Sequence, residues 1–321
     1  MTVDVAVLCG GVGAARFLRG LVQVVAPGRI AAIVNTGDDT VIHGLAISPD
    51  LDTIVYTLAE AIDPERGWGL AGETWEAMAA LERFGPARPP ASTAGATWFR
   101  LGDRDLATHL YRTGRLAEGG RPTEVADELR RAWGVDVRVL PMTDDRVATM
   151  VELATGEEVA FQDYFVRLRH AVMVRAVRFA GAADARSTDE VVEALETARA
   201  IVIAPSNPIV SIGPVRALPG VDDLLARHRD HVVAVSPIVG GVALKGPADR
   251  LLTELGHEPS VAGVARLYAP IASTLVIDPV DAALAPAVEA AGMRARVVPS
   301  VMKDAAGARD LAAATMAGTL G

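Results

Sequence analysis

The chain has 321 residues, of which 50% are hydrophobic and 22% are charged, so it can bury a large core and is not disordered as a whole. Its formal net charge of −9 argues against nucleic acid as the main partner, because phosphate-backbone binding needs a basic face. Cys9 is the only cysteine, which excludes an intrachain disulfide and a cysteine zinc site. We find neither a secretory signal nor an apolar run approaching the roughly 18–20 residues that cross a bilayer. We therefore expect a cytoplasmic protein with no membrane partner.

The N-terminal 34 residues predict a strand, a helix and a second strand. Residues 3–9 form a short apolar run that ends in glycines, which is typical of a buried parallel strand. Residues 14–25 carry apolar side chains at helical spacing, and Pro27 and Gly28 stop that helix. Residues 30–34 read as the second strand, which completes a βαβ unit.

The rest of the chain predicts further strands and helices in alternation. Strand-like runs recur at residues 200–204, 232–235, 274–277 and 295–298. Helix-like segments occupy residues 188–198, 222–228, 248–255, 282–291 and 305–317. This alternation predicts an α/β fold with a doubly wound, mostly parallel, Rossmann-like sheet.

The middle of the chain does not show this alternation of strands and helices. Residues 51–62, 73–84, 105–116 and 124–133 look helical, whereas residues 135–161 and 172–179 could add short strands to an edge of the sheet. We therefore predict a nucleotide-binding core made of residues 1–52 and 134–321. A helical insert, residues 53–133, is expected to cover the active site.

A glycine turn, Gly10, Gly11 and Gly13, follows the first predicted strand. Small residues there let backbone N–H groups approach phosphate oxygens, and a helix N-terminus adds partial positive charge. A tight turn without a ligand is the alternative. Neither standard fingerprint fits, since the third glycine of the dinucleotide pattern would fall at Arg16 and no GK[ST] follows. Arg16 either reaches a phosphate or is solvated.

Carboxylates are concentrated after the second strand. Residues 30–65 contain no Lys or Arg, but they include Asp38 and Asp39 in NTGDDT and Asp50 and Asp52 in SPDLDT. Uncompensated acids beside a phosphate site suggest Mg²⁺, a hard cation that prefers oxygen ligands. The alternatives are a polar turn for the first pair and a helix N-cap for Asp52.

Three further segments carry polar groups. LGDRDLATH, residues 101–109, holds Arg104 between two aspartates, which either orients a ligand or forms surface ion pairs. His109, in the same segment, suits a packed or solvated histidine better than a catalytic base. APSNPIVSIGP follows one strand, and the segment with Lys245 and Gly246 follows another. Loops after parallel strands meet at one edge of the sheet, so we expect them to converge with the glycine turn.

Taken together, these segments resemble one family. GGVGAARFLRGL, VNTGDD, ISPDLDT, GWG, LGDRDLATH, LPMTDD, FQDYFV, APSNPIVSIGP and SPIVGG are similar to the 2-phospho-L-lactate or phosphoenolpyruvate transferases of deazaflavin coenzyme biosynthesis. The resemblance implies that a guanosine diphosphate carrying enolpyruvate or lactate is the donor. The acceptor is then the ribityl hydroxyl of 7,8-didemethyl-8-hydroxy-5-deazariboflavin, and GMP is released. The resemblance further suggests a homodimer.

The resemblance also implies roles for individual residues. The diphosphate and nucleoside are expected to contact Gly10, Gly11, Gly13, Asn35, Ser206, Asn207, Ser211 and Gly213, with Lys245 and Gly246 on the nucleotide side. Asp38 and Asp52 are expected to hold Mg²⁺, with Asp39 as a second candidate. Asp50, Asp52 and Arg104 would orient the deazaflavin alcohol, one aspartate accepting its proton.

The sequence leaves two other classes of protein open. One is a non-catalytic, nucleotide-sugar-binding regulator of the gluconeogenesis-factor type, which would share the glycine turn and sheet but not PDLDT and GDRD. The other is a nicotinamide dehydrogenase, which the missing third glycine disfavours.

Overall fold

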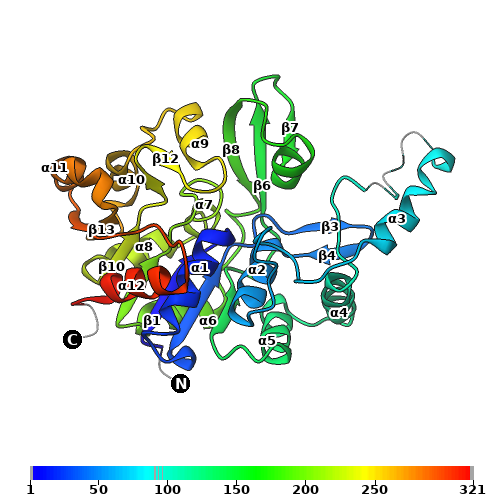
Figure 1. The fold of residues 1–321 in the computed structure, drawn as a ribbon, viewed down its shortest axis with the longest axis horizontal. Coiled ribbons are helices and arrows are strands. Elements are labelled where there is room, and N and C mark those ends of the chain that lie inside the picture. Colours follow the sequence, from blue (N-terminus) through cyan, green and yellow to red (C-terminus); the bar gives the residue numbers. More distant parts are fainter. Residues whose placement is uncertain (1–2, 90–91, 93, 96, 319–321) are drawn as a thin grey trace.

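A computed structural model describes residues 3–89, 92, 94, 95 and 97–318. Within these residues a central sheet has seven parallel strands in the order β14-β13-β10-β9-β1-β2-β5 (Figure 1). The strands are β1 (Val5–Cys9), β2 (Ile30–Val34), β5 (Arg138–Pro141), β9 (Ala200–Ile203), β10 (Val232–Val235), β13 (Thr274–Ile277) and β14 (Arg294–Val297). The predicted doubly wound parallel sheet is therefore confirmed.

Helices cover both faces of this sheet, which explains why its inner strands are apolar throughout. Successive residues of β1, such as Val7 and Leu8, belong to different core clusters, one on each face of the sheet. On the face of Val7 lie α1 (Gly11–Leu21), α2 (Pro49–Leu58) and α12 (Ala305–Met316). On the face of Leu8 lie α6 (Asp189–Thr197), α8 (Val221–Arg227), α10 (Val261–Tyr268) and α11 (Ala285–Ala290). Because both faces of such a strand are buried, apolar residues are favoured at every position, and polar and apolar residues do not alternate.

The strand order creates a switch point beside β1. The chain runs from β1 outward to β2 and later β5, whereas β9, on the other side of β1, begins the run through β10, β13 and β14. The segments that follow β1 and β9 lead to helices on opposite faces of the sheet, α1 and α8, and ligands of such sheets bind at this point.

In the described residues of the middle of the chain, we find four α-helices, a 3-10 turn at Gly85–Ala87 and one hairpin. The helices are α2, α3 (Glu76–Glu82), α4 (Asp105–Ala117) and α5 (Pro122–Ala132). The hairpin of β3 (Thr40–Ile42) and β4 (Leu45–Ile47) was not predicted from the sequence. It extends away from the sheet together with α3, on the right of Figure 1.

The expected edge strands divide into two groups. β5 adds to the edge of the central sheet, next to β2. β6 (Ala148–Leu153), β7 (Glu158–Ala160) and β8 (Val174–Ala180) instead form a separate antiparallel sheet with a small core of its own, at the top of Figure 1. Every second residue of β6 is buried, so one face of this sheet is covered. A π-helical turn, Asp163–Arg167, follows β7.

The C-terminal half differs from expectation in detail. The helix predicted at residues 282–291 is a 3-10 turn, Pro279–Leu284, followed by α11. Helix α10 was not predicted from the sequence. Further short elements are α7 (Gly213–Arg216), α9 (Ala248–Glu254), the hairpin of β11 (Ile238–Val239) and β12 (Val242–Ala243), and 3-10 turns at Pro27–Arg29 and Arg229–His231. None of the helices in the described part of the chain is long and apolar enough to cross a membrane.

Candidate functional site

The glycine turn joins β1 to α1 where other segments approach closely. A Cβ atom at Gly13 would lie 2.4 Å from the carbonyl oxygen of Pro205, and one at Gly10 would lie 2.6 Å from Asp50 Oδ2. Ser206 ties this turn to the loop after β9, because its hydroxyl donates to the Gly10 carbonyl at 2.8 Å and accepts from the Gly10 N–H at 3.3 Å. The carboxyl ends of β1 and β9 therefore meet, as parallel strands on either side of a switch point should.

Asp50 links the glycine turn to the loop after β2. Its Oδ1 accepts a hydrogen bond from the Gly11 N–H at 2.9 Å, and its Oδ2 accepts one from Asn35 Nδ2 at 3.0 Å. Burial raises the pKa of Asp50 to about 6, although the hydrogen bonds from Asn35 and Gly11 act in the opposite direction. The Gly11 N–H, expected to face a phosphate, thus donates to this carboxylate.

Asp38 and Asp39 lie directly after β2 and carry oxygens without a partner. In the described part of the chain, the buried Oδ1 atoms of both residues make no hydrogen bond. Asp39 Oδ2 accepts from the Ser48 hydroxyl at 2.8 Å. Burial raises the pKa of both carboxyl groups, to about 8 for Asp39, and the nearby charge of Asp50 further raises that of Asp38. Buried carboxylates that lack donors favour a cation.

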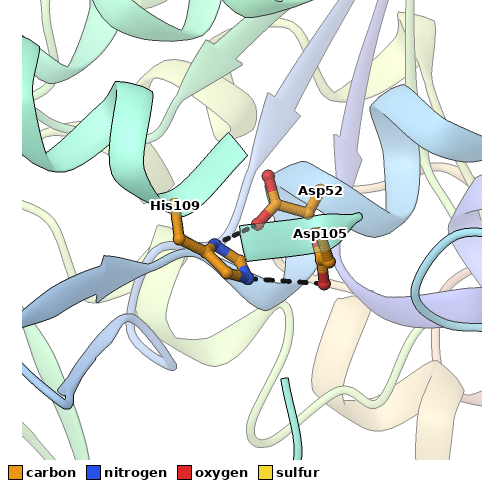
Figure 2. Close-up of side chains that lie close together, drawn as sticks. All are labelled: Asp52, Asp105 and His109. Carbon is orange, nitrogen blue, oxygen red and sulfur yellow. Dashed lines mark ion pairs between the residues drawn. The ribbon is translucent and has the colours of Figure 1, made fainter. Parts of the chain in front are cut away.

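Asp52 belongs to a different network, on α2 and α4. Arg112 donates to both of its oxygens, from Nη1 to Oδ2 at 3.1 Å and from Nη2 to Oδ1. The His109 ring lies between two carboxylates, with Nδ1 3.8 Å from Asp52 Oδ2 and Nε2 3.3 Å from Asp105 Oδ2 (Figure 2). The Tyr56 hydroxyl donates to Asp105 Oδ1 at 2.5 Å. Burial raises the pKa of Asp52, and the charge of Arg112 opposes that shift.

Two sets of residues could hold a metal ion. Asp52, Asp105 and His109 place one ligand atom each within 4.8 Å of one another. Arg112 already compensates Asp52, and an imidazole nitrogen is a poor ligand for Mg²⁺. The unpartnered oxygens of Asp38 and Asp39 fit a hard cation better, because both are oxygen ligands in need of a positive charge.

The loop after β9 and α7 contribute the other predicted nucleotide contacts. Ser211 lies beside the glycine turn, with its Cβ 3.1 Å from where a Cβ of Gly10 would be. Asn207 Oδ1 accepts from the backbone N–H groups of Ile209 and Val210, so this side chain holds the loop itself. Gly213 begins α7, where a Cβ would lie 2.8 Å from the Phe179 ring.

Two basic side chains, Lys245 and Arg16 of α1, lie close enough for their charges to interact. Lys245 Nζ donates to the Arg66 carbonyl at 3.1 Å and lies 2.7 Å from where a Cβ of Gly67 would be. Desolvation lowers the pKa of Lys245, and the positive charge of Arg16 lowers it further. Gly246 has φ +74°, a left-handed conformation that favours glycine.

Arg104 is placed differently from the two PDLDT aspartates. Its side chain is exposed, and Nη1 donates to the Ala71 carbonyl at 2.6 Å rather than to Asp50 or Asp52. Arg112, which was not predicted from the sequence as a site residue, makes the contact with Asp52 instead. Asp105, His109 and Arg112 follow one another at helical spacing, and that pattern could have indicated a shared face of α4.

A cavity of about 230 Å³ adjoins this network. Asp39, Asp52, Arg112 and Thr36 line its polar side, and the buried Thr36 hydroxyl has no hydrogen-bond partner in the described chain. Its apolar walls come from α2, α5 and β5, including Leu51, Val55, Val125, Leu129 and Val139. Such a combination is typical of sites that bind small molecules.

Comparison with solved structures gives the fold. A UPF0052 family protein from Bacillus halodurans superposes with a TM-score of 0.64, over 98% of this chain and 99% of that chain. The two sequences are 16% identical, so this likeness concerns the architecture alone.

Comparison of sequences gives the family. Residues 5–315 match the family described as 2-phospho-L-lactate transferase CofD. A phosphoenolpyruvate transferase from Streptomyces griseus subsp. griseus is 43% identical over 304 residues, 94% of this chain and 93% of that protein. Phosphoenolpyruvate transferases from Kitasatospora aureofaciens and Mycobacterium tuberculosis are 42% and 39% identical, over 97% and 94% of this chain and 96% and 94% of theirs. These matches favour an enzyme over the regulator and the dehydrogenase, and the chain belongs to the 2-phospho-L-lactate transferase family, a family of transferases.

Proposed function

We propose that this protein transfers a phosphoenolpyruvyl or 2-phospho-L-lactyl group from a guanosine diphosphate-linked donor to the ribityl hydroxyl of 7,8-didemethyl-8-hydroxy-5-deazariboflavin. The relatives named phosphoenolpyruvate transferase favour the enolpyruvyl donor. The observation that carries the proposal is the position of Asp50, which joins the glycine turn to Asn35, in the loop after β2, at the switch point of the sheet.

In the proposed reaction, the hydroxyl oxygen of the acceptor attacks the distal phosphorus of the donor. A new P–O bond forms, the bond from that phosphorus to the bridging oxygen breaks, and GMP leaves with the electron pair. The hydroxyl proton passes to Asp50, whose pKa of about 6 leaves it largely ionised at neutral pH.

Asp38 and Asp39 would hold Mg²⁺, the proposed cofactor, which would supply positive charge beside the transferred phosphoryl group. Their unpartnered buried oxygens support this assignment. Asp52 stays a predicted ligand, but both of its oxygens already accept from Arg112. Lys245 and Arg16 would add positive charge on the diphosphate side of the glycine turn.

The acceptor ring would occupy the apolar cavity beside Asp39 and Asp52, which leaves its hydroxylated chain close to the carboxylates. Residues 53–133 would cover this side of the site as a helical insert on the core of residues 1–52 and 134–321. We further propose that the protein acts in the cytoplasm as a homodimer.

Mass spectrometry of the products tests the reaction. Purified protein is incubated with Mg²⁺, the deazaflavin alcohol and either the enolpyruvyl or the lactyl guanosine diphosphate donor. We expect a phosphodiester-linked deazaflavin and an equal amount of GMP, with the enolpyruvyl donor turned over faster. Absence of product with both donors would contradict the proposed function.

A further inference from the structure

A buried ion pair connects α2 to α4. Arg112 and Asp52 are 4% and 7% exposed, and the guanidinium donates to both carboxylate oxygens. Arg112 Nη1 also lies 3.4 Å from the Ala46 carbonyl of β4, to which it donates. One side chain of α4 therefore contacts both the hairpin and the first turn of α2.

The guanidinium is suited to this position by its shape. Its planar fork matches a carboxylate with two parallel hydrogen bonds, which fixes orientation as well as distance. Removing one partner of a buried pair leaves the other charge buried and uncompensated, whereas removing both is often tolerated. Arg112 and Asp52 should therefore behave as a unit.

The ion pair bears on the active site through the geometry of α2. Asp50 and Asp52 are two residues apart in its first turn. Successive helical residues are rotated by about 100°, so the two side chains point to nearly opposite sides of the helix. Asp52 faces Arg112, and Asp50 faces the Gly11 N–H and Asn35. Any rotation of this turn that releases Asp52 must also turn Asp50 away from the glycine turn.

A chain of side-chain contacts leads from this ion pair back to α2, through His109, Asp105 and Tyr56. Arg112 Nη1 lies 3.3 Å from His109 Nδ1, and the opposite ring nitrogen faces Asp105. Asp105 accepts a hydrogen bond from the hydroxyl of Tyr56, which also belongs to α2. The two helices are thus joined at two successive turns of α2.

From these contacts we infer that Arg112 is a positioning residue, which holds Asp52 and thereby aims Asp50 at the reacting hydroxyl. In this role Asp52 orients its helix and does not bind the magnesium ion. The inference rests on the proposed transfer reaction for its kinetic test, and on hydrogen exchange for its structural test.

The kinetic test compares Arg112→Met, Asp52→Asn, the double variant and Arg112→Lys with wild type. Each single variant should lower kcat by roughly 10–100-fold, the loss expected when a reacting group is displaced by about 1 Å. The Mg²⁺ concentration for half-maximal activity should stay unchanged. Arg112→Lys should recover part of kcat, because it restores the charge without the two-pronged geometry.

Arg115→Met is the matched control, since Arg115 lies on the same helix but pairs with Glu118 and Glu128 at its surface. It should leave kcat and magnesium dependence unchanged. If Asp52→Asn raises the magnesium requirement tenfold or more while Arg112→Met does not, Asp52 is a ligand and the inference is wrong. An unchanged kcat in folded Arg112→Met would also overturn it.

Amide hydrogen exchange gives a readout that needs no turnover. Peptides that cover residues 10–21 and 48–58 should exchange faster in Arg112→Met than in wild type or Arg115→Met, because Asp50 no longer holds the Gly11 N–H. Unaltered exchange would contradict the positioning role. Failure of wild type to form product would instead contradict the proposed function, and the exchange result would still decide the role of Arg112.

Discussion

At the scale of single residues, the four carboxylates of NTGDDT and SPDLDT differ in their hydrogen-bond partners. Asp50 accepts two hydrogen bonds, Asp52 accepts a guanidinium, and one oxygen each of Asp38 and Asp39 accepts nothing within the described chain. Burial raises the pKa of all four, most clearly to about 8 for Asp39 and about 6 for Asp50. Groups of one chemical type with different environments can perform different tasks at one pH.

The proton-accepting role of Asp50 can be tested by Asp50→Asn. The amide oxygen can still accept from the Gly11 N–H, so the fold should persist, while kcat should fall by roughly 10²–10⁴-fold, the usual contribution of a general base. In wild type, kcat should decline as the pH falls through about 6, because a protonated Asp50 cannot accept a proton. Steady-state kinetics from pH 5 to 8 measure both effects.

Asp136→Asn is the control for this substitution, because it removes an exposed carboxylate. It should leave both kcat and the pH profile unchanged. A wild-type-like kcat in Asp50→Asn would assign the proton to another acceptor.

At the scale of elements, close backbone contacts fix how helices pack on the sheet. α1 and α12 lie side by side over the same face (Figure 1). At their crossing, Gly20 lies so close to α12 that a Cβ there would be 2.2 Å from the Ala308 carbonyl oxygen. Backbone atoms of a packed helix cannot move aside as a flexible side chain can, so glycine is needed at this position for space.

Gly20→Ala should therefore destabilise the protein by roughly 1–3 kcal/mol through overpacking, despite the better helix propensity of alanine. Gly114→Ala provides the matched control in α4, where a Cβ would have nothing within 4 Å. That variant should gain roughly 0.5–1 kcal/mol. Urea denaturation measures both changes, and equal effects at the two sites would contradict the packing argument.

At the scale of the whole molecule, the buried acids affect stability against pH. Asp39 has a pKa of about 8 in the folded chain and an ordinary value of 3.8, so the folded state binds its proton more tightly. Stability is then highest while Asp39 is protonated and is lost as the pH rises from about 4 to about 8. Acids whose pKa is lowered, such as Asp4 and Asp103, lose their contribution only as the pH falls through values below 3.8.

The melting temperature of the magnesium-free protein should therefore fall between about pH 6.5 and pH 8. Burial lowers the pKa of His43 from its ordinary 6.5, so the unfolded chain binds this proton more tightly, and His43 opposes the decline near pH 6.5. Asp39→Asn should flatten the decline. Mg²⁺ should raise the melting temperature more at pH 8 than at pH 6.5, because carboxylates must lose their protons to bind it.

Thermal denaturation at the two pH values, with and without Mg²⁺, makes this measurement. A melting temperature that rises from pH 6.5 to pH 8 in the magnesium-free protein would contradict the burial of these carboxyl groups. Equal stabilisation by Mg²⁺ at both values would argue against Asp39 as a ligand.

The sequence alone determined the layered fold and the family. Strands such as β1 and β2 are apolar at every position because both faces are covered, and that property is visible without coordinates. The glycines after β1 and the order of the PDLDT and GDRD motifs likewise depend only on the local chain.

Tertiary structure decided which side chains act together. The β3–β4 hairpin and the separate β6–β7–β8 sheet consist of short strands whose pairing partners the local pattern does not specify. Asp50 meets Gly11 across 39 positions and Asp52 meets Arg112 across 60, and no spacing rule predicts such contacts. Periodicity encodes which face of an element is buried, but only the packed fold determines which charge lies opposite which.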